Sequence, residues 1–275
     1  MTQVTDGAPA PIVAGKLYAL GATVSQNGDI HWVAKGRKGD AALNAYLLTE
    51  GKEGLLVDTN YPIIEDALIG QLKTFGLNDL KIVFTRAVEF DSMANADVIV
   101  DQFPVSEIWS HFAASDWVYL RTEEPLPVPN YESKMFGADG EVALSGGRVL
   151  ETINAKLKLL NAAWLYDATS RTLFTSDAFS HVMAPKPGVR VVTEETDSTT
   201  ADDVTEHLRT KFKWIEGADT EPLREFVQQT FEKYDIEHIA PTIGCAISGR
   251  NLVVRHRDFV IDALRKLDGK ENLNG

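Results

Sequence analysis

The sequence predicts a mixed α+β protein in which two layers of β-structure pack together and helices cover them from outside. The order of the expected elements supports this, because it runs hairpins, helix, strand, hairpins, helices, strand, helix. A doubly wound parallel sheet would instead alternate one strand with one helix. Hydrophobic residues make up 44% of the chain and charged residues 24%, which is ordinary for a globular protein. Neither an internal repeat nor an obvious linker divides the chain.

Short apolar runs bounded by turn residues predict the strands of the first half. Asn27-Gly28 is a hairpin turn signal between the first two of them. The expected strands lie at residues 17–20, 29–33, 44–49, 54–59, 81–85 and 106–110. Apolar residues at helical spacing behind Pro62 predict a helix over 61–75. The small and polar residues 1–15 are expected to form a flexible N-terminal tail.

The second half predicts two more hairpins and three helices. Gly146-Gly147 turns a hairpin over 141–152, and residues 168–170 turn the next one. Its remaining expected strands lie at 162–167, 171–177 and 238–241, and its amphipathic helices at 200–215, 220–234 and 258–267.

Charge and cysteine content exclude several classes of function. The chain has 27 basic and 40 acidic residues, a formal net charge of −13, which disfavours nucleic-acid and membrane-surface partners. No apolar run approaches the ~20 residues of a membrane-spanning helix, and the N-terminus does not resemble a secretory signal. Cys245, the single cysteine, excludes a disulfide framework and a multi-cysteine metal site. We therefore expect a cytoplasmic protein.

Four segments resemble, in the right order, motifs of the metallo-β-lactamase superfamily. They are Leu55-Leu56-Val57-Asp58-Thr59, Ile82-Val83-Phe84-Thr85, Thr172 to Phe179, and Ile239 to Gly244. Within the superfamily the sequence is most similar to the sandwich domain of flavodiiron and oxygen-binding di-iron proteins. The resemblance covers residues 16–267 and implies a four-layer αββα sandwich, forming a single metallo-β-lactamase-like domain over 16–275. In that family the domain holds a pair of metal ions on histidines and carboxylates.

The chain departs from the family at the histidines. The resemblance places family carboxylates at Glu89, Asp91 and Asp177. The family's histidine positions hold Ala87 (or Arg86 with a one-residue slip), Ser92, a residue near Lys158, and Ile243. Iron and zinc prefer neutral imidazole ligands, whereas carboxylates alone suit hard cations. No transition-metal cofactor is therefore expected.

Three crowded carboxylates need a compensating positive charge, or their pKa values rise. One hypothesis is that Lys158, alone or together with Arg86, supplies the charge that metal ions supply in the relatives. The alternative is that Lys158 points to solvent and the alignment is two residues off. His181, close after Asp177, matches a histidine that is not a ligand in the relatives. The predicted pocket comprises Arg86, Glu89, Asp91, Ser92, Lys158, Asp177, His181 and Ile243.

Two functions follow from this pocket. The first is a metal-free pseudoenzyme that binds a small-molecule ligand or protein partner, or that uses non-metal chemistry with Lys158 or Asp177 as catalytic candidates. The alternative is a metal-dependent hydrolase or di-iron oxygen-handling protein with a rearranged site. That site would hold one or two ions of iron, zinc or manganese on Glu89, Asp91 and Asp177. Because flavodiiron relatives dimerise head to tail, a homodimer is a further expectation.

Overall fold

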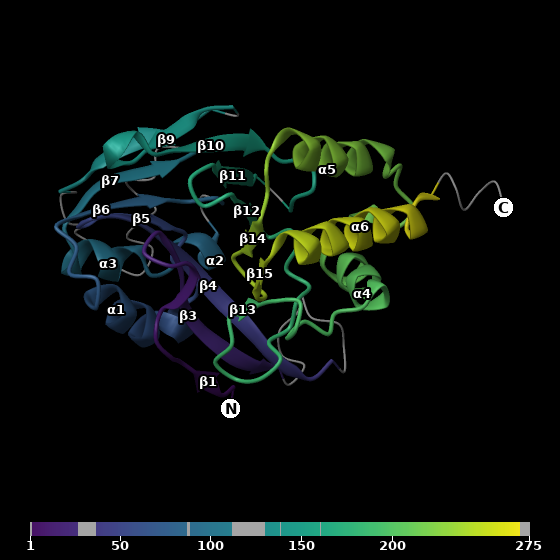
Figure 1. The fold of residues 1–275 in the computed structure, drawn as a ribbon, viewed down its shortest axis with the longest axis horizontal. Coiled ribbons are helices and arrows are strands. Elements are labelled where there is room, and N and C mark those ends of the chain that lie inside the picture. Colours follow the sequence, from purple (N-terminus) through teal and green to yellow (C-terminus); the bar gives the residue numbers. More distant parts are fainter. Residues whose placement is uncertain are drawn as a thin grey trace.

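The computed structural model describes residues 2–26, 37–86, 89–111, 130–137, 139–159 and 161–269, and these form four layers. Two β-sheets pack face to face, and each is covered on its outer side by helices (Figure 1). This arrangement confirms the predicted αββα sandwich.

The first sheet has the strand order β1-β3-β4-β5-β6-β7-β8, with β2 also paired to β3. Its strands are β1 (Val4–Thr5), β2 (Ala10–Val13), β3 (Leu17–Gln26), β4 (Gly39–Glu50), β5 (Glu53–Val57), β6 (Asp79–Val83), β7 (Val105–Ser110) and β8 (Glu132–Met135). Three short helices belong to this half: α1 (Glu65–Lys73), preceded by the 3₁₀ turn η1 (Pro62–Ile64), then α2 (Phe90–Met93) and α3 (Ala96–Gln102). Strands β5 and β6 run parallel, so their carboxyl ends reach the same edge.

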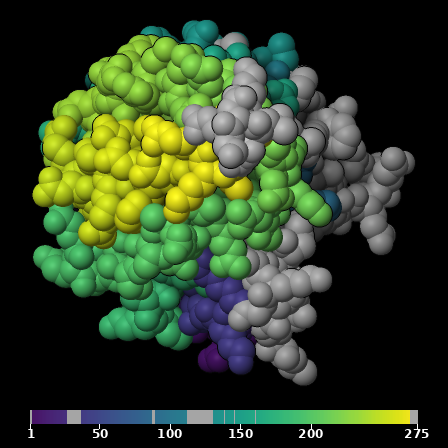
Figure 2. All heavy atoms as spheres, turned by 90° about the vertical axis from the view of Figure 1, so that its right-hand side faces the viewer, coloured from purple at the N-terminus to yellow at the C-terminus, as the bar shows by residue number. Residues whose placement is uncertain are grey.

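The second sheet has the order β13-β15-β14-β12-β11-β10-β9. Its strands are β9 (Glu141–Ala143), β10 (Val149–Asn154), β11 (Ala163–Asp167), β12 (Thr172–Ser176), β13 (Val191–Val192), β14 (His238–Pro241) and β15 (Ala246–Ser248), with the 3₁₀ turn η2 (Ser145–Gly147) between β9 and β10. Helices α4 (Ala201–Lys211), α5 (Glu221–Lys233) and α6 (Arg250–Lys266) cover it, and η3 (Lys213–Ile215) follows α4. Helix α6 contacts both of the others and runs between them on the face shown in Figure 2.

Successive side chains along a strand point to opposite faces of its sheet, and together they fill three separate apolar layers. In β5, Leu55 enters the layer between the sheets, whereas its neighbour Leu56 packs under α1 and α3. In β12, Phe174 enters the same central layer and Leu173 packs under α4, α5 and α6. Both sheets are therefore apolar on both faces, as the inner layers of a four-layer sandwich must be.

Several elements differ from the predictions. The segment predicted as a loose tail adds β1 and β2 to the first sheet, because its backbone pairs with β3 at Val4↔Val24 and Ala10↔Ala19. The predicted strand 29–33 lies outside the described residues, and the hairpin partner of β3 is β4. Helix α6 begins eight residues before the predicted 258, since Gly249 at φ 116° allows the chain to turn into it. No helix among the described residues is long and apolar enough to cross a membrane.

Candidate functional site

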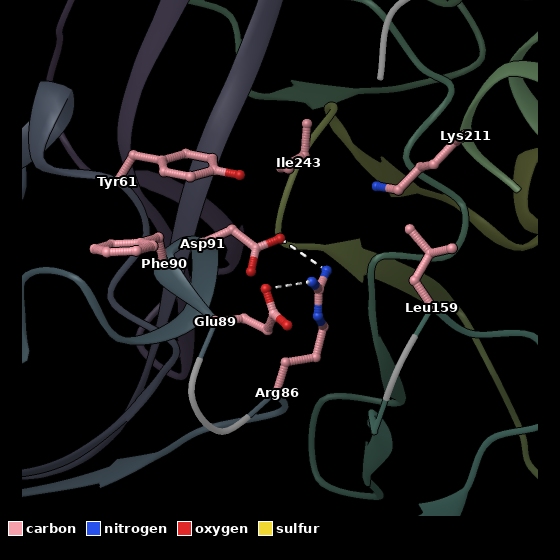
Figure 3. A pocket seen from close by; sticks show the side chains of 8 residues that line it. All are labelled: Tyr61, Arg86, Glu89, Phe90, Asp91, Leu159, Lys211 and Ile243. Atoms are coloured by element: carbon pink, nitrogen blue, oxygen red, sulfur yellow. Dashed lines mark hydrogen bonds and ion pairs between the residues drawn. The ribbon is translucent and has the colours of Figure 1, made fainter. Parts of the chain in front are cut away.

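A cavity of about 290 Å³ lies where the segments that follow β5, β6, β10 and β14 meet the end of α4. Parallel pairing of β5 with β6 and of β12 with β14 brings the carboxyl ends of these strands to one edge of each sheet. The cavity is lined by Tyr61, Arg86, Glu89, Phe90, Asp91, Leu159, Lys211 and Ile243 (Figure 3). Of the residues that the sequence predicted for the pocket, Arg86, Glu89, Asp91 and Ile243 line it directly.

The Arg86 guanidinium lies among the three carboxylates that match the family's metal ligands. Its Nη1 donates to Asp91 Oδ2 at 2.8 Å and lies 3.7 Å from Asp177 Oδ2, and its Nη2 lies 3.3 Å from Glu89 Oε2. Arg86 is buried, as are Asp91 and Asp177. Burial alone would lower the pKa of Arg86, but the neighbouring carboxylates raise it. The guanidinium is therefore a permanent cation at the centre of the site.

Asp58 holds the loops around the cavity together from behind. It follows β5 with φ 59° and accepts hydrogen bonds from Thr85 N (2.8 Å), Thr85 Oγ1 (2.7 Å), Thr242 Oγ1 (2.9 Å) and Ser92 Oγ. Ser92, predicted for the pocket, thus lies behind it as a partner of Asp58. Burial raises the pKa of Asp58 to about 6, although these hydrogen bonds lower it.

The raised pKa of Asp58 predicts a pH dependence of stability. Because the folded-state pKa of about 6 lies above the usual value near 3.8, this group stabilises the fold below that usual value, and the effect is lost as the pH rises through 6. Wild type should therefore lose about 2 kcal/mol relative to Asp58→Asn between pH 4 and pH 7. Urea unfolding of both proteins across this range measures the difference. Stability curves that stay parallel would contradict the prediction.

Lys211, at the end of α4, supplies the second basic side chain of the cavity. Its Nζ donates to Ser180 Oγ at 3.0 Å, and Figure 3 shows the side chain pointing towards the cavity. Burial lowers the pKa of Lys211, and the positive charge of Arg86 lowers it further. The carboxylates of Asp177 and Asp91 act in the opposite direction and raise it.

Lys158 does not line this cavity, and its ammonium donates to Asn154 Oδ1 at 3.2 Å. Sequence analysis does not find Lys211, because this residue belongs to a helix that lies far along the chain from every family motif. No local signal marks it.

Asp177 is buried beside the cavity, behind Arg86. Its Oδ2 accepts from Leu159 N at 2.8 Å, and its Oδ1 has no hydrogen-bond partner among the described residues. Burial raises the pKa of Asp177, and the nearby charges of Lys211 and Arg86 partly offset this rise.

Three histidines from distant segments come together behind Ser180. His181 Nε2 lies 2.9 Å from His256 Nδ1, and His256 Nε2 lies 3.1 Å from Asp197 Oδ2. His207 Nε2 lies 3.2 Å from Ser180 Oγ, and its ring packs edge-on against that of His181. Burial holds the pKa values of His181 and His207 well below their usual range. His181, predicted for the pocket, is therefore a buried neutral group that does not line the cavity.

The residues of this site do not fit a pair of transition-metal ions. Within the part of the chain that the structure describes, no group of three or more His, Cys, Asp or Glu side chains is placed to hold a metal. The carboxylates of Asp91 and Asp177 face a guanidinium, and none of the described residues that line the cavity is a histidine. Iron and zinc sites use imidazole or thiolate donors, and the described lining residues supply neither.

The fold and the position of the site define a protein with the metallo-β-lactamase fold. The solved structures that resemble this chain include flavodiiron proteins and a metallo-β-lactamase. Rubredoxin oxygen:oxidoreductase from Desulfovibrio gigas matches with a TM-score of 0.65 at 14% identity, over 96% of this chain and 62% of that one. A flavoprotein from Thermotoga maritima matches with a TM-score of 0.61 at 13% identity, again over 96% and 62%. A metallo-β-lactamase from Pontibacter korlensis matches with a TM-score of 0.53 at 14% identity, over 96% and 99%.

This chain therefore spans less than two thirds of the Desulfovibrio gigas and Thermotoga maritima proteins. No protein-family model matches the sequence. No curated protein matches it either.

Proposed function

We propose that this protein is a cytoplasmic metallo-β-lactamase-fold protein whose site functions without a metal ion and binds a small organic ligand in the cavity. One observation carries the proposal: the Arg86 guanidinium pairs with Asp91, Glu89 and Asp177, the three carboxylates that resemble metal ligands. A divalent cation placed among these carboxylates would face a buried permanent positive charge a few ångströms away. Such repulsion is strong where little water screens it.

The lining indicates the kind of ligand. Two basic side chains, Arg86 and Lys211, face the carboxylates of Glu89 and Asp91, and Asp177 adds a third carboxyl group beside them. This balance does not favour a strongly anionic ligand. Leu159, Ile243 and the rings of Tyr61 and Phe90 supply apolar and aromatic surface (Figure 3). Because the cavity of about 290 Å³ is at the lower end of the range for ligand pockets, the ligand is expected to be a small, largely neutral molecule.

Metal content tests the proposal. Untagged protein is expressed with iron, zinc and manganese supplied, and its metals are measured by inductively coupled plasma mass spectrometry. We expect less than about a tenth of an equivalent of any of these metals, because a true site fills when its metal is supplied. The matched variant is Asp177→Asn, which removes a carboxylate while keeping the shape of the side chain.

About one or two equivalents in wild type, lost in Asp177→Asn, would contradict the proposal. That result would favour the alternative, a metal-dependent hydrolase or a di-iron oxygen-handling protein.

A further inference from the structure

We propose that Lys211 is a nucleophilic amine that forms an imine with a small neutral aldehyde or ketone in the cavity. This inference rests on the proposed metal-free site and names the class of its ligand. Lys211 is the last residue of α4, and Figure 3 shows its Nζ directed towards the cavity from the side opposite Tyr61 and Phe90. A carbonyl compound bound among these residues would meet the amine, which is the main requirement for covalent catalysis.

The hydrogen bonds around Ser180 leave the lone pair of Lys211 available. Ser180 Oγ has one proton, and it donates that proton to the carbonyl oxygen of Asp177 at 2.7 Å. The same oxygen must then accept from both Lys211 Nζ and His207 Nε2. Ser180 therefore fixes the direction of the Lys211 side chain without donating to its nitrogen. No other hydrogen bond to Lys211 Nζ is found among the described residues.

The surroundings of Lys211 also favour its neutral form. Burial and the charge of Arg86 lower the pKa of Lys211, against the opposing carboxylates of Asp177 and Asp91. Burial in turn raises the pKa of Asp177, whose Oδ1 lacks a partner. A carboxyl group that ionises less readily holds the ammonium form of Lys211 less strongly. Desolvation and a neighbouring cation are two recognised ways in which proteins activate a lysine.

The reaction balances without a redox partner. The neutral Lys211 nitrogen attacks the carbonyl carbon, the C=O π electrons move to oxygen, and a proton passes from nitrogen to that oxygen to give a carbinolamine. The nitrogen lone pair then forms the C=N bond as the C–O bond breaks. The leaving hydroxyl takes a proton from solvent water and departs as water, and the nitrogen gives its remaining proton to the hydroxide that this leaves. The net products are one imine and one water.

Reductive trapping tests this proposal. The probe is butanone with sodium cyanoborohydride at pH 7, and peptide mass spectrometry measures the rate at which each lysine is alkylated. Lys213 is the matched control, because it lies two residues further on and is exposed. We expect Lys211 to be alkylated at least about tenfold faster than Lys213 in the folded protein. In urea, where the site is lost, the two rates should become equal.

Two variants complete the test. Lys213→Arg should keep the fast-labelled site, and Lys211→Arg, which keeps a long side chain but forms no imine, should lose it. Metal content is measured on the same sample. Equal labelling of Lys211 and Lys213 in metal-free folded protein would overturn the imine proposal alone. About one equivalent of bound metal would overturn both this proposal and the metal-free site on which it rests.

Discussion

Replacing Arg86 by alanine is expected to lower the free energy of unfolding by about 3–5 kcal/mol, because removal of one partner of a buried ion pair leaves the other charges uncompensated. Asp91 and Asp177 are buried, and Asp91 accepts the shortest contact of the guanidinium at 2.8 Å. Without Arg86, both carboxylates would have to take up protons or admit water. Urea unfolding at pH 7 measures the loss.

The matched control is Arg171→Ala. The Arg171 side chain is 44% exposed and pairs with Asp235 and Glu237 at the surface, so its loss should cost less than about 1 kcal/mol. Neutralising a carboxylate in the Arg86→Ala background, by Asp91→Asn, should recover part of the stability. A loss at Arg86 no larger than that at Arg171 would show that the buried charges are compensated in some other way.

The fold could be predicted because its elements depend on local patterns. Apolar runs separated by turn residues place most strands, and the apolar spacing behind Pro62 places α1 with its 3₁₀ turn. Elements held in place by tertiary contacts were missed. Strands β1 and β2 are short and exist through pairing with β3, and α2 and α3 lie in and just after the segment that was interpreted as a degenerate metal motif.

The candidate site could be predicted only where its residues belong to motifs. Glu89, Asp91 and Asp177 follow strands β6 and β12, whose order is fixed by the fold, and the structure places them around Arg86. The strand order of the fold does not fix which lysine reaches the cavity. Residues 154–161 contain no histidine that would fix the alignment, whereas Lys211 reaches the cavity from α4, a helix that covers the second sheet. Contacts of this kind depend on packing, and one sequence does not reveal them.

The histidine cluster illustrates the same limit. His181, His207 and His256 belong to a loop and two different helices, so no pair of them has the spacing of residues on one face of an element. The stacking of His181 on His256 depends on how α6 packs on the second sheet. These buried histidines are linked to Lys211 through Ser180, whose hydroxyl contacts both His207 and Lys211.

Asp197 accepts the hydrogen bond at the end of this row of buried histidines. Its replacement by alanine is expected to lower the free energy of unfolding by about 3–5 kcal/mol. Its Oδ2 accepts from buried His256 Nε2 and from Arg255 Nη2 at 2.8 Å, and its Oδ1 accepts from Thr199 Oγ1 at 2.7 Å. Alanine would leave His256 buried without an acceptor. Asp197→Asn keeps an acceptor and should cost less. Asp262→Ala, at an exposed pair with Arg265, is the matched control and should change stability by less than about 0.5 kcal/mol.

The pH dependence separates the charge of Asp197 from its shape. Burial would raise the pKa of this carboxyl group, but hydrogen bonds from His256, Thr199 and Arg255 outweigh burial and hold the pKa well below its usual range. The stability that the charge contributes is therefore present above the usual value of about 3.9 and is lost as the pH falls below it. Wild type should exceed Asp197→Asn in stability at pH 7, and the two should converge towards pH 2. If the difference in stability between wild type and Asp197→Asn did not change with pH, Asp197 would stabilise the protein through its shape and hydrogen bonds alone.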